Sequence, residues 1–348
     1  MRDVVILGSG FAGLEAAVLL SKEKDIALTV VDKSKYFTFA PSIHFLISDK
    51  RKLQEITIDL EKFYKKRNVK FVKEGVIRIN PEKDTVETRN KTIKYDFLII
   101  SSGFETNFFN TSIRENSIGL KTIEEAFEIK KRLSKIKKNI VIAGGGLTGI
   151  ETAYEIKESS NFKIILVEKN PQLMPQFNKK LGIAVERHIL KTGIEVKKGT
   201  GIKGIKKKII LDNGDSIKAD LVIWTAGIKL PEWIIKSKIP YDGGGIIVNQ
   251  FLHSTEYDRL YAAGDVASVQ NADSKKTAQT AVMMGKRAAK NIIRKINGKP
   301  QRGFRTKQEL YLISLGKDGL IVYKNFFMIN RIFLWMKNLV EKMYLAFK

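Results

Sequence analysis

The sequence predicts an α/β protein built on two similar strand–turn–helix units, each of which begins a parallel sheet. The segment from Asp3 reads DVVILGSGFAGLEAAVLL, and the segment from Asn139 reads NIVIAGGGLTGIETAYEI. A buried strand, a glycine-rich turn and a helix therefore occur twice. Each unit is followed by a second β-branched strand that ends in an acidic residue, Asp32 or Glu168. A length of 348 residues also favours more than one domain.

The two turns correspond residue by residue at a fixed separation. The glycines lie at positions 8, 10 and 13 and at 144, 146 and 149, and the differences 144 − 8 and 168 − 32 are both 136. A single G-x-G-x-x-G pattern is weak, but each copy here follows a strand, opens a helix and precedes an acid by about 20 positions. The combination indicates two Rossmann-like dinucleotide-binding sites. The glycines let the backbone approach a pyrophosphate, and the acid accepts hydrogen bonds from a ribose.

Two dinucleotide sites in one chain predict an oxidoreductase in which hydride passes between a nicotinamide and a flavin. Glu168 favours NADH over NADPH, because its carboxylate would repel a 2′-phosphate. A further strand, in RLYAAGDVA, ends at Gly264 and Asp265, and the helical segment KTAQTAVMMGKRAAKNIIRKI follows it. An acid at that strand tip suits the hydroxyl-rich ribityl chain of a flavin.

The order of these motifs resembles that of the two-dinucleotide-binding flavoprotein superfamily, to which glutathione reductase belongs. The order is the first turn, YDFLIISSG, the second turn, LVIWTAG and the terminal Gly-Asp. The finer resemblance is to the type II NADH dehydrogenases, which are NADH:quinone oxidoreductases. It rests on VVDKSKYFTFAPSIH, SSGFETNFF, GLKTIEEAFEIKKRL, AGGGLTGIETA, LVEKNPQLMPQF and TAQTAVMMG. The sequence departs from that family at Met283, where the second glutamine of an Ala-Gln-x-x-x-Gln helix would fall.

The resemblance implies that the first turn and the Gly-Asp hold non-covalent FAD and that the second turn holds NADH as a substrate. For FAD it implies contacts from Gly8, Ser9, Gly10, Phe11, Ala12, Gly13, Asp32, Lys33, Val76, Ser102, Gly103, Gly264, Asp265, Ala278 and Gln279. For NADH it implies contacts from Gly144, Gly146, Leu147, Thr148, Gly149, Glu168 and Gly227.

Glu151 and Gln279 are the candidates for a catalytic role. Glu151 lies two residues after the last glycine of the second turn, where a carboxylate can orient a nicotinamide or handle charge at the flavin. A carboxylate at that position also offsets the helix dipole, which is an ordinary structural role. Gln279 opens a helix whose N-terminus we expect to face the flavin carbonyls. His44 is either a group that positions flavin or quinone or an ordinary structural histidine.

The composition limits the chemistry and the partners. The chain has no cysteine, which excludes disulfides, thiolate metal sites and redox dithiols, so a bound flavin would react directly with donor and acceptor. With three scattered histidines, at 44, 188 and 253, we expect no metal site. The net charge of +25 favours anionic partners such as acidic lipid. The basic runs lack interleaved aromatic residues, so we expect no specific nucleic-acid binding.

The last segment, NFFMINRIFLWMKNLVEKMYLAFK, covers residues 325–348 and predicts one amphipathic helix, because its apolar residues recur at three- and four-residue steps. Lys337, Glu341 and other charges interrupt it, so we expect it to lie in a membrane interface rather than to span a bilayer. The alternative is a core or dimer-packing helix. We expect the fold not to depend on this segment, and we expect neither a signal peptide nor a membrane-spanning helix.

The predicted architecture has an FAD domain (residues 1–108 and 243–295), an inserted NADH domain (109–242) and a C-terminal region (296–348). The predicted function is transfer of electrons from NADH through FAD to a membrane quinone. The enzyme would be peripheral, at the cytoplasmic face of the cell membrane, on an anionic lipid surface, with a possible homodimer. The alternatives are a reductase of a ferredoxin-like protein, which the basic charge also suits, and a non-catalytic flavoprotein sensor or binding module.

Overall fold

The computed structural model describes residues 1–136, 138–272, 275–305, 310–346 and 348. The chain forms two compact units, and each is interrupted in sequence by the other. The first unit consists of Met1–Phe37, Ile58–Glu105 and Lys229–Lys307, and the second of Thr38–Thr57, Thr106–Ile228 and Gln308–Lys348. Each unit contains one five-stranded parallel sheet, so the predicted α/β class with two Rossmann-like folds is confirmed.

The sheet of the first unit is centred on β1 and has the order β22-β9-β1-β2-β5. Its strands are β1 (Arg2–Leu7), β2 (Ile26–Val31), β5 (Lys70–Val72), β9 (Phe97–Ile100) and β22 (Leu260–Ala262). The β-branched and leucine side chains of β1 from Val4 onward are almost fully buried, as a central parallel strand requires. Helix α1 (Phe11–Leu20) packs against α8 (Ala278–Ile296), and a Cβ on Gly285 of α8 would overlap the carbonyl oxygen of Ala12.

The sheet of the second unit repeats this plan around β12, with the order β11-β18-β12-β13-β14. Its strands are β11 (Ile118–Gly119), β12 (Asn139–Ala143), β13 (Lys163–Glu168), β14 (Glu195–Lys198) and β18 (Leu221–Trp224). Its helices in this region are α3 (Thr111–Asn116), α4 (Ile123–Leu133), α5 (Leu147–Ser159) and α6 (Lys179–Leu190). In both units the central strand leads directly into a glycine turn and a helix.

Shorter elements complete the two units. The small strands are β3 (Tyr36–Thr38), β4 (Thr57–Asp59), β6 (Val76–Asn80), β7 (Thr85–Thr88), β8 (Thr92–Lys94), β10 (Glu105–Thr106), β15 (Ile202–Ile205), β16 (Ile209–Leu211), β17 (Ser216–Ile217), β19 (Ile228–Lys229), β20 (Tyr241–Asp242), β21 (Gly245–Val248) and β23 (Ala267–Val269). The remaining helical turns are η1 (Ala40–Leu46), η2 (Leu53–Glu55), α2 (Leu60–Lys65), η3 (Pro81–Lys83) and α7 (Glu232–Lys236).

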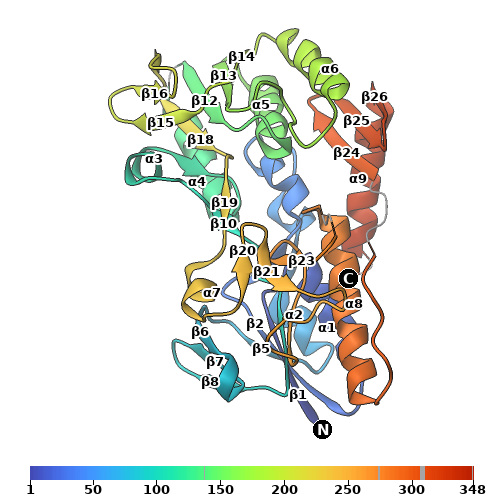
Figure 1. Ribbon diagram of the computed structural model, residues 1–348. Helices are drawn as coiled ribbons and strands as arrows, with labels where there is room; N and C mark the ends of the chain where they lie inside the picture. Colours follow the sequence, from blue (N-terminus) through green and yellow to red (C-terminus); the bar gives the residue numbers. More distant parts are fainter. Residues whose placement is uncertain (137, 273–274, 306–309, 347) are drawn as a thin grey trace. The chain divides into compact units, whose positions relative to one another are not determined.

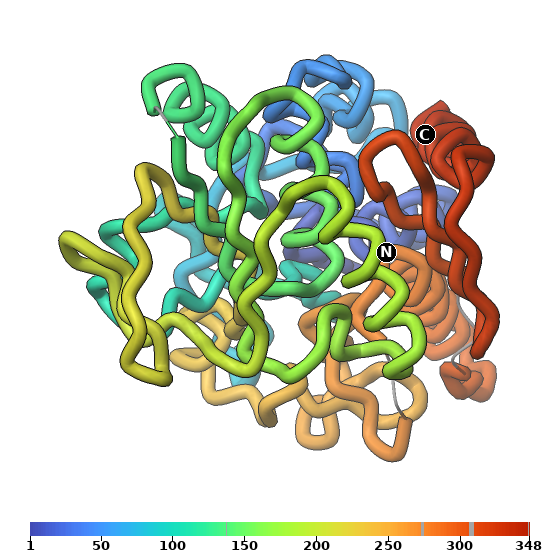
Figure 2. Tube along the Cα trace, turned by 90° about the horizontal axis from the view of Figure 1, so that it is seen from above, coloured from blue at the N-terminus to red at the C-terminus, as the bar shows by residue number. Residues whose placement is uncertain are grey.

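The C-terminal segment of the second unit corrects the expectation of one helix over residues 325–348. A three-stranded antiparallel sheet, β24 (Leu310–Leu315), β25 (Asp318–Tyr323) and β26 (Phe326–Asn330), precedes helix α9 (Arg331–Ala346), and α9 packs against β24 and β25 (Figures 1 and 2). Lys324 takes a φ of 56° in the tight turn that pairs Tyr323 with Phe326. The apolar spacing of residues 326–330 fits a helix and an alternating strand equally. The hairpin turn at Lys324 favours the strand, because it pairs these residues with β25.

Helix α9 turns charged residues inward, which the sequence analysis did not predict, whereas the contact of its apolar residues with a membrane stays a prediction. Its buried residues are two charged ones, Lys337 and Glu341. Large apolar side chains on it are exposed instead: Ile332, Trp335, Leu339, Val340 and Met343. We call these five residues the outer face of α9. The expectation that the fold does not depend on this segment is therefore wrong, because part of the helix belongs to the core of the second unit.

In the part of the chain that the structure describes, no helix is both long enough and apolar enough to cross a bilayer.

The two compact units also divide the chain at other positions than the predicted domains. Residues 38–57 and 308–348 belong to the second unit, because η1 packs on α5 and the β24–β26 sheet packs on α5 and α9. Which unit binds which dinucleotide stays a prediction.

Candidate functional site

The first glycine turn is shaped to leave backbone amides at a helix end. Gly8 takes a φ of +95°, and a Cβ on Gly13 would overlap the carbonyl oxygen of Gly8. Gly10 is the N-cap of α1 and provides no side-chain cap, and the first helical hydrogen bond runs from Leu14 to Gly10. The N–H groups of Phe11, Ala12 and Gly13 therefore project from the helix end, which is the arrangement that binds a phosphate.

The end of β9 fixes this turn from the side. Ser101 donates from Oγ to the carbonyl oxygens of Leu7, at 3.0 Å, and Gly8, at 2.8 Å. The next residue, Ser102, has a buried Oγ without a hydrogen-bond partner, and Gly103 takes a φ of +65°. A buried hydroxyl without a partner beside this glycine turn fits a bound ligand that supplies one. The assignment of Ser102 and Gly103 as flavin contacts stays a prediction.

Asp32 links the turn to the end of β2. Its carboxylate accepts hydrogen bonds from the Ser9 N–H, at 2.5 Å, and the Ser34 N–H, at 2.8 Å. Burial raises the pKa of Asp32, and these two backbone donors act in the opposite direction. A carboxylate offers about four acceptor positions, so Asp32 keeps capacity for a ribose diol.

The second turn repeats this geometry in the second unit. Gly144 takes a φ of +107°, a Cβ on Gly149 would overlap the carbonyl oxygen of Gly144, and Gly146 is an N-cap without a capping side chain. The first helical bond runs from Ile150 to Gly146, which leaves Leu147, Thr148 and Gly149 in the first turn of α5. Two fingerprints with the same glycine roles therefore fit two pyrophosphates.

Glu168 repeats the contacts of Asp32. It accepts from the Gly145 N–H at 2.6 Å and from the Asn170 N–H at 2.7 Å. Thr225 matches Ser101, because it follows the third strand and donates from Oγ1 to the Ala143 carbonyl oxygen at 2.7 Å. The sequence analysis missed this pair of hydroxyl residues. The signal was present in both copies, because a hydroxyl residue directly follows each hydrophobic strand: the first serine of SSG and the threonine of TAG.

The remaining predicted contacts fall on both units. Gly264 takes a φ of +82° two residues after the end of β22, with Asp265 half-buried next to it. Ala278 and Gln279 open α8 behind the N-cap Thr277. These residues belong to the first unit, as do Lys33, after β2, and Val76, at the start of β6. Gly227 belongs to the second unit, takes a φ of +76° and lies against the ring of Phe109.

Glu151 lies in a buried polar cluster of the second unit. Its carboxylate accepts hydrogen bonds from the Lys337 Nζ, at 2.8 Å, and from both the N–H and the Oγ of Ser314, at 3.0 Å each. Burial acts to raise the pKa of Glu151, but the Lys337 charge and the donors outweigh it, so the pKa lies below its ordinary value. Glu151 is therefore an ionised carboxylate held by a cation from the C-terminal helix.

His44 belongs to the same cluster. Its Nε2 lies 3.0 Å from Ser314 Oγ, and its Nδ1 lies 3.9 Å from Glu151. Burial lowers the pKa of His44 to about 3, so the imidazole is neutral at ordinary pH. Because the single proton of the Ser314 hydroxyl goes to the carboxylate, Nε2 of His44 is the donor of this contact. The cluster gives His44 a positioning role beside Glu151.

Sequence reasoning missed three members of this cluster. Ser314 lies in β24, and Lys337 and Glu341 lie in α9, far from the glycine motifs in the sequence. The sequence signal was weak, because a charged residue within an apolar helical stripe is usually solvated. Only the tertiary fold shows that the charged side of this helix is the inner one.

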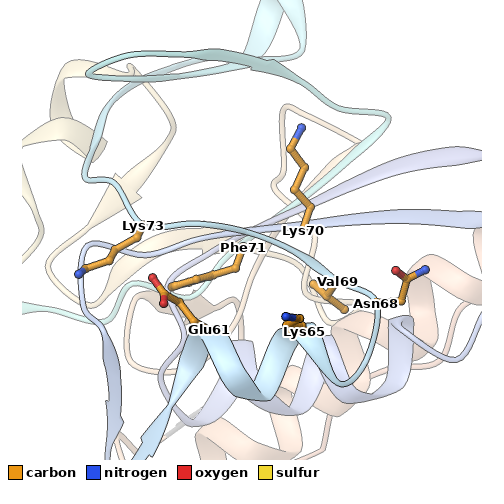
Figure 3. Close-up of a pocket in the computed structure, with 7 residues that line it drawn as sticks. All are labelled: Glu61, Lys65, Asn68, Val69, Lys70, Phe71 and Lys73. Carbon is orange, nitrogen blue, oxygen red and sulfur yellow. The ribbon is translucent and has the colours of Figure 1, made fainter.

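A separate open pocket of about 490 Å³ lies beside β5, the edge strand of the first sheet. Its lining residues are Glu61, Lys65, Asn68, Val69, Lys70, Phe71 and Lys73 (Figure 3). Phe71 points toward Glu61 of α2, whereas Lys70 points to the opposite side of the strand (Figure 3). None of the sequence-predicted site residues lines it, so this pocket is not part of the candidate site.

Comparisons with known proteins agree with this geometry. Residues 2–285 match the family model described as pyridine nucleotide-disulphide oxidoreductase. A type II NADH:quinone oxidoreductase of Staphylococcus haemolyticus is 27% identical over 92% of this chain and 90% of its own length. Two solved structures share the fold. The sulfide:quinone oxidoreductase of Aquifex aeolicus has a TM-score of 0.88 and 22% identity, over 99% of this chain and 91% of that chain. NDH2 of Plasmodium falciparum, solved with NADH, has a TM-score of 0.87 and 17% identity, over 96% and 93% of the two chains.

Proposed function

The chain belongs to the pyridine nucleotide-disulphide oxidoreductase family, and we propose that it is an FAD-dependent NADH:quinone oxidoreductase. The observation that carries this proposal is the duplicated turn, in which Asp32 and Glu168 make the same contacts in two parallel-sheet units. One turn would hold FAD and the other NADH. The name of the Staphylococcus haemolyticus relative supports a quinone as the acceptor.

In this proposal the flavin carries the electrons from nicotinamide to quinone, and the chain positions the reactants. The helix ends at Gly10 and Gly146 bind the two pyrophosphates, and Asp32 and Glu168 bind the riboses. Glu151, held by Lys337, supplies a fixed negative charge at the proposed NADH domain. The chain has no cysteine, so no step passes through a cysteine sulfur.

The experiment that tests the function starts from the purified protein, which should be yellow and release FAD on denaturation. NADH should bleach the flavin absorbance, and a short-chain quinone should restore it. A ferredoxin and a quinone are offered in parallel as acceptors. A protein that stays colourless after incubation with FAD would overturn the proposal, and faster reoxidation by ferredoxin would replace quinone with a protein acceptor.

Glu168 should select NADH over NADPH. Replacing Glu168 by Ala removes the carboxylate that would repel a 2′-phosphate, so the preference for NADH should fall by about tenfold, which is equivalent to about 1.4 kcal/mol. The measurement is kcat/KM for both cofactors. The control is Glu128→Ala, because Glu128 lies in the same unit and pairs with Arg132 within α4. A wild type that already prefers NADPH would contradict the role of Glu168.

The outer face of α9 is proposed to rest on an anionic membrane, which would make the enzyme peripheral. Deleting residues 325–348 does not test this, because the deletion also removes β26 and the buried Lys337. Replacing Trp335 and Leu339 by Glu should weaken binding to anionic vesicles by about 2–4 kcal/mol, since two large exposed side chains lose their burial in lipid. FAD content and reduction of a water-soluble quinone should stay unchanged.

The matched control for the membrane test is Lys342→Glu, which changes charge on α9 without removing apolar surface. It should weaken vesicle binding by about 2 kcal/mol at low salt, because it removes one basic group and adds an acidic one. That loss should disappear at high salt, whereas the loss in the Trp335/Leu339 variant should remain. Unchanged vesicle binding by the double variant, with a smaller oligomer in solution, would assign the outer face to a second subunit.

A further inference from the structure

Glu341 is a buried charged group of the second unit whose carboxyl oxygens lack hydrogen bonds. Its side chain is 4% exposed, and neither carboxyl oxygen has a hydrogen-bond partner. The hydroxyl of Ser42 is also buried and lies beside this carboxyl, where it acts to lower the pKa of Glu341 but makes no hydrogen bond of good geometry. A buried ionised carboxylate normally accepts several hydrogen bonds, because losing its hydration is costly.

The two cations next to Glu341 direct their donors elsewhere. Lys337 Nζ lies 3.6 Å from Glu341 but donates to Glu151, at 2.8 Å, and to the Pro41 carbonyl oxygen, at 3.1 Å. The Arg51 guanidinium is 3.6 Å from Glu341 but donates to the Asn338 amide oxygen at 2.8 Å. Glu151 thus accepts the hydrogen bond of Lys337. Glu341 lies between two cations, neither of which donates a hydrogen bond to it.

Burial raises the pKa of Glu341 above its ordinary value, and the charge of Glu151 adds to the rise. The charge of Lys337, the Ser42 hydroxyl and the charge of Arg51 act to lower it. These three charges face Glu341 from α9, from the segment after η1 and from α5. We propose that Glu341 is a buried carboxylic acid that stores a proton for Lys337, the cation that pairs with Glu151. The proposal rests on the proposed function, because reduction of a quinone by NADH also consumes one proton from water.

In the proposed step one proton moves from Glu341 to Lys337. When the proton-consuming reaction draws a proton from the Lys337 ammonium, the O–H bond of Glu341 breaks and an N–H bond forms on Lys337. Glu341 then becomes a carboxylate between Lys337 and Arg51, 3.6 Å from each cation, and regains its proton from water. No electrons move among these groups. Glu341 is a positioning and proton-storing residue, since it acts through Lys337.

Infrared spectroscopy of the holoenzyme tests the protonation directly and without turnover. The wild type minus Glu341→Gln difference spectrum near neutral pH should contain the carbonyl band of a protonated carboxylic acid, which shifts in D₂O. The matched control is Glu158→Gln, because Glu158 is ion-paired with Lys50 at 2.8 Å and should contribute only carboxylate bands. Absence of the carbonyl band in the Glu341→Gln difference would overturn the proposal.

Stopped-flow kinetics tests the consequence. Glu341→Gln keeps the shape of the neutral acid, so bleaching of the flavin by NADH should be unchanged, whereas reoxidation by quinone should slow about 100-fold. Glu341→Asp, which keeps an acid, should recover part of that rate, and it replaces the Gln variant if the latter does not fold. Equal reoxidation rates in wild type and Glu341→Gln would overturn the storage role. Failure of NADH to bleach the wild type would reject the proposed function and leave the infrared result standing.

Discussion

The Gly146→Ala variant is expected to fold, to keep its flavin and to lose about 100-fold or more in the rate at which NADH reduces that flavin. Gly146 has a φ of −79°, which alanine adopts without strain, and a Cβ there meets no atom within 4 Å. The space in front of it is where the pyrophosphate would approach the helix end. A methyl group should therefore leave the protein intact and displace the ligand, and a displacement of about 1 Å can cost about 100-fold in rate.

The measurement is the NADH dependence of flavin bleaching, together with thermal unfolding and FAD content. Gly75→Ala is the matched control, since a Cβ on Gly75 also meets nothing within 4 Å but lies outside both turns. Gly149→Ala should behave differently from Gly146→Ala. Its Cβ would overlap the Gly144 carbonyl oxygen, so stability and NADH binding should fall together. A normal rate of flavin reduction by NADH in Gly146→Ala would mean that the second turn does not hold the dinucleotide.

The two turns were predictable because their function requires a local sequence pattern. Glycines, a β-branched strand and an acid at a fixed spacing specify the turn, the helix and the carboxylate, and the structure places Asp32 and Glu168 as the repeat requires. For Ser102, which the family resemblance placed among the flavin contacts, the structure adds a buried hydroxyl without a hydrogen-bond partner. Local rules predicted these elements because each one is encoded within about 30 residues.

The cluster around Glu151 was not predictable by the same means. Glu151, His44, Ser314 and Lys337 come from four distant segments, and their assembly depends on which face of α9 turns inward. The periodicity of α9 predicts a helix with two faces but does not say which one is buried. Exposed apolar and buried charged residues reverse the usual rule, which is the pattern expected where a helix serves both a buried site and an apolar partner surface.

The second large effect is expected for Lys337→Met, which should lower the free energy of unfolding by about 3–5 kcal/mol at neutral pH. The substitution keeps the apolar stem and removes the cation that pairs with Glu151 at 2.8 Å, so the carboxylate stays buried without its charge partner. Lys342→Met, at an exposed position of the same helix, should change stability by no more than about 0.5 kcal/mol. Chemical denaturation of the FAD-loaded proteins measures both.

The pH dependence separates loss of the ion pair from loss of packing. In the wild type, the pKa of Glu151 is lower in the folded state than its ordinary value. The charge on Glu151 therefore contributes fully to stability at pH values above its ordinary pKa. That contribution is lost as the pH falls through the pKa of Glu151 in the folded state. In Lys337→Met, burial no longer has an opposing cation, so the folded pKa of Glu151 should rise above the unfolded value. The variant should then be most impaired at high pH and should approach the wild type as the pH falls.

Adding Glu151→Gln should restore most of the lost stability, because the amide needs no cation. A Lys337→Met defect that is the same at every pH, or that the second substitution does not relieve, would show that Lys337 contributes packing and that Glu151 is not held by its charge.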